Sequence, residues 1–130
     1  MMPLPPWPRL AAFCLCLGLL LAAVVPTARL TAAAETGFVA DIADLPLMPG
    51  LAEVPESGVT FDKASGRIVE AFAHGAVASA EVRRFYRQTL PQLGWDRLGR
   101  DAYAREGERL TLDYLGRDGD LTVRYTLAPR

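Results

Sequence analysis

Residues 110–127 read LTLDYLGRDGDLTVRYTL, and this stretch decides the fold class. Hydrophobic residues alternate with polar ones on both sides of Asp118 and Gly119. Alternation with a period of two is typical of strands that bury one face and expose the other. Asp-Gly is a strong two-residue turn signal because both residues tolerate positive φ. The stretch therefore predicts an antiparallel β-hairpin with one buried face.

Further strands are predicted on both sides of one helix. Residues 59–61 and 67–73 alternate around a turn-rich stretch and form a second hairpin, which Gly75 closes. Glycine-containing turns at 99–101 and 106–108 separate the later strands. The expected strands cover residues 59–61, 67–73, 95–98, 102–105, 110–114 and 121–127.

A single helix is predicted from Ser79 onward. Ser79 is a good N-cap, and Glu81 in the first turn suits the positive end of the helix. Pro91 should tighten or kink the last turn, and Gly94 should end the helix. The apolar residues recur at helical spacing in one stripe, which consists of Val82, Phe85, Tyr86, Leu90 and Leu93.

These elements predict an α+β fold for residues 58–130. One helix packs its apolar stripe on an antiparallel sheet of about five to six strands. The expected order is β-β-α-β-β-β, with or without a sixth strand at the end. Clean alternation in the last two strands means that the other face of the sheet is wet.

Residues 35–57 form an acidic, proline-containing arm. They carry five carboxylates and no basic residue, and three prolines disfavour a helix. We expect the arm to be disordered at its start and docked from about Leu45 onward. Packing along its own domain is the preferred interpretation, and a partner-binding peptide is the alternative. The apolar residues concerned are Leu45, Leu47, Met48 and Leu51.

Residues 1–34 have the order of a secretory signal peptide. Arg9 precedes an uncharged apolar run at 10–25, and small residues at 32–34 suit cleavage after Ala34. The run has 16 residues, whereas a stable membrane span needs about 20. An uncleaved inner-membrane anchor through 10–25 is the alternative. Cys14 and Cys16 follow bulky residues, so a lipoprotein is not expected.

Cleavage would leave a mature chain of 96 residues in the periplasm or outside the cell. Both cysteines lie in the removed segment, so no disulfide or thiolate site is expected. The mature chain would contain 12 basic and 15 acidic residues, a net charge of −3. The net charge of the full chain is −1, which argues against nucleic acid as a partner, and no stable membrane span is expected after cleavage.

Residues that carry chemistry are few, and we predict no enzyme. His74 is the only histidine, so a multi-histidine metal site within one chain is excluded. A hydrolase would need His74 as base beside Ser57, Ser65 or Ser79, and no nucleophile-elbow pattern surrounds any of them. Phosphate-loop and dinucleotide glycine patterns are also missing from the sequence. We therefore expect no catalytic residue, no cofactor and no metal.

Arginines are the most suggestive polar residues. Arg83, Arg84 and Arg87 share one face of the predicted helix. A solvated face is the plain interpretation. Contact with an anionic partner protein, polysaccharide or lipid head group is the alternative. Four more arginines are expected on the wet sheet face, namely Arg97, Arg105, Arg109 and Arg124.

Three stretches resemble a group of small exported proteins of alphaproteobacteria. They read DLPLMPGL at 44–51, FYRQTLPQLGW at 85–95 and REGERL at 105–110. The resemblance spans most of the mature chain and rests on structural motifs. It implies an envelope location and carries over no catalytic residues.

The sequence thus predicts a non-enzymatic periplasmic protein-binding or envelope accessory module. A small-ligand or anion-binding periplasmic domain is the alternative, and a hydrolase is less favoured. A homodimer through an exposed strand edge is compatible with either. The expected partner-binding residues are Leu45, Leu47, Met48, Leu51, Arg83, Arg84 and Arg87.

Overall fold

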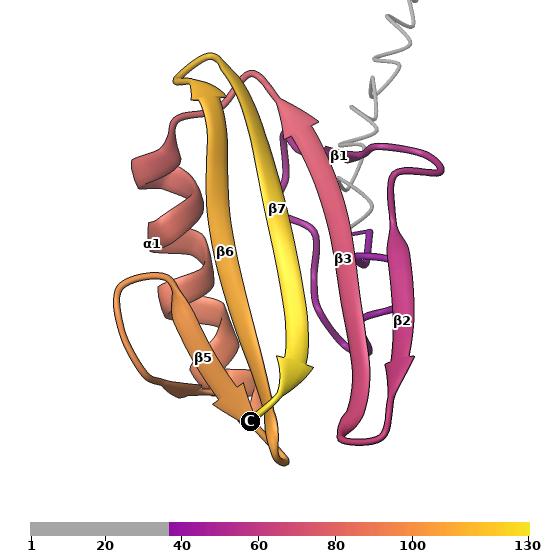
Figure 1. Ribbon diagram of the computed structural model, residues 1–130. Helices are drawn as coiled ribbons and strands as arrows, with labels where there is room; N and C mark the ends of the chain where they lie inside the picture. Colours follow the sequence, from indigo (N-terminus) through magenta and orange to yellow (C-terminus); the bar gives the residue numbers. More distant parts are fainter. Residues whose placement is uncertain (1–36) are drawn as a thin grey trace, which may run out of the picture. The chain divides into compact units, whose positions relative to one another are not determined.

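The computed structural model describes residues 37–130, and the predicted signal peptide at 1–34 lies outside them. One α-helix packs against an antiparallel sheet in this part of the chain (Figure 1). The predicted α+β class with an antiparallel sheet is therefore confirmed. Within the described residues, no helix is long and apolar enough to cross a membrane.

The sheet has seven strands, three before the helix and four after it. The expected order of two strands before the helix is wrong, because the arm itself adds a short edge strand. In chain order the elements are β1 (Ala52–Glu53), β2 (Val59–Lys63), β3 (Gly66–Gly75), α1 (Ser79–Thr89), the 3₁₀ helix η1 (Leu90–Leu93), β4 (Asp96–Arg97), β5 (Ala102–Arg105), β6 (Glu108–Arg117) and β7 (Asp120–Pro129).

The last strand lies in the middle of the sheet. The spatial order is β1-β3-β7-β6-β5-β4, and β2 pairs with the same edge of β3 as β1 does. Both predicted hairpins are present. Lys63 pairs with Gly66 in the first, and Arg117 pairs with Asp120 in the second. Strand β7 therefore joins the β2–β3 hairpin to the β4–β5–β6 meander.

One face of the sheet is covered, and it is covered by two different segments. Alternate residues of β3, β6 and β7 are buried on this face, in agreement with the sequence pattern. Helix α1 and the arm both lie behind the sheet in Figure 1, and both contribute to the same core. The covering residues of α1 and η1 are Val82, Tyr86 and Leu90, which are fully buried.

The start of α1 differs from the sequence prediction. Ser79 is the first helical residue and not the N-cap, which is Ala78. The N–H of Ser79 has no acceptor within the helix. It donates instead to the Oδ1 atom of Asp118, 2.9 Å away in the β6–β7 turn. The Oε2 atom of Glu81 accepts from the N–H of Ala78 at 3.2 Å. The carboxylate of Asp118 therefore caps the N-terminus of α1, whereas the sequence predicted that the hydroxyl of Ser79 would do so.

The end of the helix follows the prediction. Pro91 lies in η1, where the last turn tightens from α to 3₁₀ geometry. Gly94 then adopts a φ of 84°, a left-handed conformation that glycine tolerates without strain. Trp95 follows and is buried against the sheet. This reversal brings β4 and the next loop back alongside α1.

The arm is part of the core. Val39, Ile42, Leu45 and Leu51 are all buried, so docking begins by Val39 and not at Leu45 as expected. Residues 52–53 then pair with the end of β3 as β1. The arm approaches β3 so closely that a Cβ atom on Gly75 would overlap the carbonyl oxygen of Gly50. The interpretation that packs the arm along its own domain accounts for these contacts.

Candidate functional site

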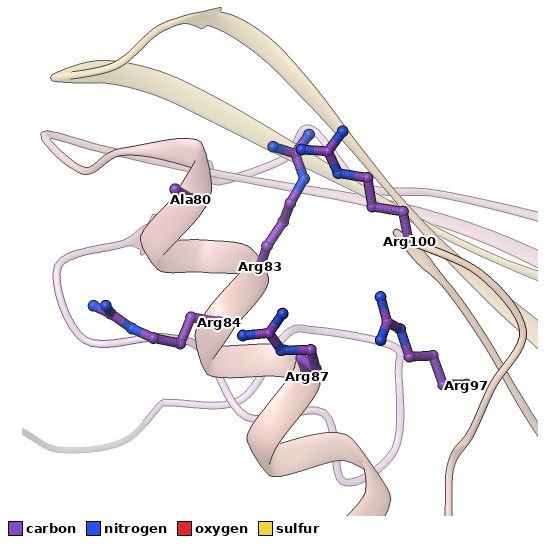
Figure 2. A pocket seen from close by; sticks show the side chains of 6 residues that line it. All are labelled: Ala80, Arg83, Arg84, Arg87, Arg97 and Arg100. Atoms are coloured by element: carbon purple, nitrogen blue, oxygen red, sulfur yellow. The ribbon is translucent and has the colours of Figure 1, made fainter.

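Five arginines line a cleft beside α1. The cleft has a volume of about 380 Å³ and holds arginines from α1, β4 and the β4–β5 loop (Figure 2). Residues 37–130 contain 12 basic and 14 acidic side chains, so nearly half of the basic residues gather here although the net charge is negative. The residues that line the cleft are Ala80, Arg83, Arg84, Arg87, Arg97 and Arg100.

The helix supplies one wall and the reversed chain the other. Arg83 and Arg87 are four residues apart and therefore share one side of α1. Arg97 ends β4, and Arg100 lies in the loop that leads to β5. The N–H groups of Leu98 and Gly99 both donate to the carbonyl of Ala102, which closes this loop. The cleft thus depends on the turn at Gly94, because this chain reversal brings the second wall beside the three helical arginines.

Arg83 is held in place by its neighbours. Its Nε atom donates to both carboxylate oxygens of Asp101, at 3.0 and 3.2 Å. Its guanidinium carbon lies 4.4 Å from the ring centroid of Tyr114, a cation–π contact. The side chain is only 27% exposed, so the expectation of an exposed arginine is wrong here. Because Asp101 uses Nε, both terminal Nη groups are without a protein partner among residues 37–130.

Tyr114 completes this support. Its hydroxyl donates to the Oδ1 atom of Asp101 at 3.2 Å. Burial raises the pKa of Tyr114 above its usual value of 10.0, and the negative charge of Asp101 raises this pKa further. The hydroxyl therefore stays protonated at neutral pH and continues to donate. Asp101 is thus fixed from two directions and holds Arg83 in one orientation.

Arg97, on the opposite wall, is exposed and has a single local anchor. Its Nε atom donates to the carbonyl of Gly99 at 2.8 Å, which leaves its two Nη groups available. Arg84, Arg87 and Arg100 make no hydrogen bond or ion pair within the described part of the chain. Figure 2 shows the guanidinium groups of Arg83 and Arg100 next to each other in this view, and it shows the side chains of Arg84 and Arg87 directed away from Arg97.

The cleft gathers five positively charged hydrogen-bond donors, and few negative charges lie beside them to balance their charge. Among the described residues, Asp101 is the only carboxylate that forms an ion pair with a lining arginine. Neighbouring like charges repel each other, and an anion between them removes this repulsion. Guanidinium groups donate hydrogen bonds and accept none. The arrangement can bind oxyanions, and the lining residues supply no nucleophile or general base.

The predicted partner-binding leucines lie elsewhere. Leu45 and Leu51 are buried in the core, so a partner cannot reach them in this fold, and this part of the expectation is corrected. Leu47 and Met48 are half-buried and pack against the same core. Partner binding through Leu47 and Met48 stays a prediction.

The other predicted arginines divide between the two faces of the sheet. Arg124 pairs with Asp113 across β7 and β6 at 2.8 Å, on the uncovered face. Arg105 instead stacks on Trp95 at 4.5 Å and donates to the carbonyls of Leu93 and Ala43. The expectation of a wet-face position is therefore wrong for Arg97, which lies in the cleft, and for Arg105, which closes the end of the helix.

His74 does not form a catalytic group with serine in the described residues. Its Nε2 atom lies 2.8 Å from the Oδ1 atom of Asp120, and both side chains are exposed. Ser57 donates to the carbonyl of Val54, and Ser79 begins α1. Residues 37–130 also contain no cluster of three or more His, Cys, Asp or Glu side chains suited to a metal ion.

The sequence missed the second wall of the cleft. The helical arginines were found from their spacing, whereas Arg97 and Arg100 join them only through the chain reversal. Gly94 followed by Arg97 on the returning strand and Arg100 in the next loop is the signal that could have indicated it.

Comparisons with known proteins add no assignment, since no family model, curated protein or solved structure matches the chain. The resemblance to exported alphaproteobacterial proteins stays a prediction. Function is therefore argued from the cleft.

Proposed function

We propose that this protein is a non-enzymatic domain of the cell envelope that binds an anionic ligand in the arginine cleft. One observation carries the proposal. Arg83 and Arg97 are both anchored through Nε, and both leave their Nη groups free in a cleft with three more arginines. Donors that are fixed before binding lose less conformational entropy when a ligand arrives. The envelope location rests on the predicted signal peptide.

This proposal prefers the anion-binding hypothesis to the hypothesis that the arm binds a protein partner. The cleft is a concave site built from charged groups, whereas two of the four apolar arm residues are buried in the core. Hydrogen bonds between guanidinium and an oxyanion are charge-assisted and about twice as strong as neutral ones. Anion binding should weaken as the salt concentration rises, because all of the lining arginines except Arg83 are exposed.

Isothermal titration calorimetry with the purified protein tests the proposal. The probes are phosphate, sulfate and citrate at one fixed ionic strength. Arg87→Ala and Arg100→Ala remove donors that have no structural partner among the described residues. We expect each to lower affinity by about tenfold, which corresponds to the loss of one charge-assisted contact.

Arg109→Ala and Arg117→Ala are the matched controls. Both residues are exposed on β6 and outside the cleft, and each variant removes the same charge. We expect these variants to bind within about twofold of the parent protein. Equal losses in both sets would show that bulk charge, and not the cleft, attracts the anion. Absence of binding by all three probes would overturn the proposal.

A further inference from the structure

One edge of the sheet ends in a strand whose outer side is unpaired within residues 37–130. Strand β2 pairs only with β3, and Figure 1 shows it as the outermost strand on its side. All five of its residues are exposed, including the large apolar Val59 and Phe61 at 42% and 53%. An exposed apolar edge strand is a template for pairing with another chain. We propose that β2 pairs antiparallel with β2 of a second copy of this chain, which joins two sheets into one.

The register of the β2–β3 hairpin shows which main-chain groups of β2 are free. Lys63 and Gly66 pair across a two-residue turn, and residues next to such a turn exchange both backbone hydrogen bonds. Bonding alternates along antiparallel strands, so the N–H and C=O groups of the odd-numbered β2 residues face β3. Those of Thr60 and Asp62 face outward and have no backbone partner among the described residues. The edge therefore offers two donors and two acceptors.

A two-fold axis at Phe61 satisfies all four of these groups. The N–H of Thr60 would donate to the carbonyl of the partner's Asp62, whose N–H would donate to the carbonyl of Thr60. The axis repeats both bonds, so the same surface of each copy is used, as a symmetric dimer requires. Phe61 then lies opposite the partner's Phe61 at a non-hydrogen-bonded position, where side chains are closest and aromatic pairs stabilise a sheet.

Charge complementarity identifies the occupant of this edge as a second copy. With the axis at Phe61, Lys63 lies opposite the partner's Val59. The partner's Glu70 is the β3 neighbour of that Val59 and lies on the same face of the sheet. The Lys63 side chain would extend over Val59 towards this carboxylate, and symmetry makes two such contacts. The edge is thus complementary to itself in charge as well as in hydrogen bonding.

The other positions of the two-fold axis are less favourable. An axis at either charged residue of β2 places identical charges opposite each other, and such pairs destabilise a sheet. An axis at the first residue of β2 places Asp62 opposite the partner's Glu56, again with like charges. An axis at Thr60 places Lys63 opposite the partner's Ser57, outside β2 and away from the glutamate on β3. The axis at Phe61 is therefore preferred.

The dimer would leave the arginine cleft open. Strands β2 and β4 belong to opposite edges of the sheet, and the second wall of the cleft begins in β4. This inference therefore stands or falls independently of the proposed function. The contact involves five strand residues from each copy, which is a small interface. We expect a weak dimer, with a dissociation constant of roughly 1–100 µM.

Sedimentation equilibrium of the purified protein over about 1–500 µM measures the dimer. Thr60→Pro removes an outward N–H and places a ring at the edge, while the bonds of β2 to β3 stay in place. We expect it to weaken the dimer at least about tenfold, because two intermolecular hydrogen bonds are lost. Thr60→Val keeps the N–H and is the matched control, with a dissociation constant within about twofold of the parent.

Charge reversals test the position of the axis even if the proline variant does not fold. Within one copy, Lys63 pairs with Gly66 and Glu70 pairs with Val59, so the two charged side chains do not face each other. Lys63→Glu and Glu70→Lys each put like charges together across the interface and should weaken the dimer about threefold or more. The double variant restores opposite charges and should dimerise within about twofold of the parent.

Three outcomes would contradict the inference. A protein that stays monomeric up to about 500 µM would overturn it, and the edge would then be available to an extended peptide of another protein. Equal dimerisation of Thr60→Pro and Thr60→Val would overturn pairing through β2. A double charge reversal that dimerises no better than the single variants would overturn the axis at Phe61.

Discussion

The hydroxyl oxygens of Tyr86 and Tyr125 lie 2.8 Å apart in the buried centre of the domain. Tyr86 also donates to the carbonyl of Pro46 at 3.0 Å. Because each hydroxyl has one proton, Tyr125 must be the donor to Tyr86. The resulting chain of two hydrogen bonds joins β7, α1 and the arm. At these hydrogen bonds α1 and the arm, the two segments that cover the sheet, contact each other.

Phenylalanine variants at these positions should differ in stability. Tyr125→Phe removes one hydrogen bond and leaves the bond from Tyr86 to Pro46, so we expect a loss of about 0.5–1.5 kcal/mol. Tyr86→Phe leaves both the Pro46 carbonyl and the Tyr125 hydroxyl buried without a partner, so we expect about 2–3 kcal/mol. Urea unfolding followed by circular dichroism measures both.

The double variant is the control for this order. With both hydroxyls gone, only the Pro46 carbonyl loses its partner, so the two losses should not add. A Tyr125→Phe variant less stable than Tyr86→Phe would contradict the direction of the chain.

Stability should fall at alkaline pH. Burial raises the pKa of Tyr86 from 10.0 to about 12, and burial and the neighbouring Tyr86 raise that of Tyr125. Below about pH 10 these groups are protonated in both folded and unfolded chains. As the pH rises from 10 towards 12 the unfolded chain ionises first, and the free energy of unfolding falls by up to about 1.4 kcal/mol per pH unit for each tyrosine.

Urea unfolding between about pH 8 and about pH 11.5 measures this loss. Tyr125→Phe should show a smaller slope above pH 10, since one titrating group is gone. A free energy of unfolding that stays constant up to pH 11.5 would rule out the buried tyrosines as the cause.

Asp118 should stabilise the helix from outside it. Asp118→Ala removes the acceptor for the Ser79 N–H and a negative charge at the helix N-terminus, so we expect a loss of about 0.5–2 kcal/mol. Asp120→Ala removes the same charge two residues away, where Asp120 only pairs with exposed His74. The control should cost less than about 0.5 kcal/mol. Thermal unfolding compares them, and equal melting temperatures would refute the cap.

The arm should contribute to stability in proportion to burial. Leu45→Ala empties a fully buried position and should cost about 2–5 kcal/mol. Replacing half-buried Leu47 and Met48 together with serine should cost less and preserve the fold. Urea unfolding compares the two, and cross-linking in cells then tests whether the serine variant loses a partner. If it unfolds as readily as Leu45→Ala, the partner interpretation of the arm fails.

Local patterns predicted the hairpins and the helix well. Strict alternation around Asp118 and Gly119 gave the central hairpin, and the apolar stripe with Gly94 gave the helix and its end. The arm was harder, because Val39 and Ile42 are isolated apolar residues without a period. Strand β1 has only two residues and lies between prolines, so no alternation could mark it.

The candidate site shows the same division. Helical spacing grouped Arg83, Arg84 and Arg87, but it could not show that Asp101 would hold Arg83. The cap on α1 comes from a residue 39 positions away from Ser79. Such contacts depend on tertiary structure. Here the contact with Asp118 replaces the local N-cap that the sequence rule predicts.

The central position of β7 also sets the order in which the chain can fold. Its partners β3 and β6 are joined to each other only through residues 120–129. A nascent chain that lacks these residues has two separate hairpin systems and no continuous sheet on which α1 and the arm can close. Its hydrophobic strands stay unpaired at their inner edges until residues 120–129 have been made. A chain of this topology remains without its core for as long as β7 is missing, which would suit the export that the predicted signal peptide implies.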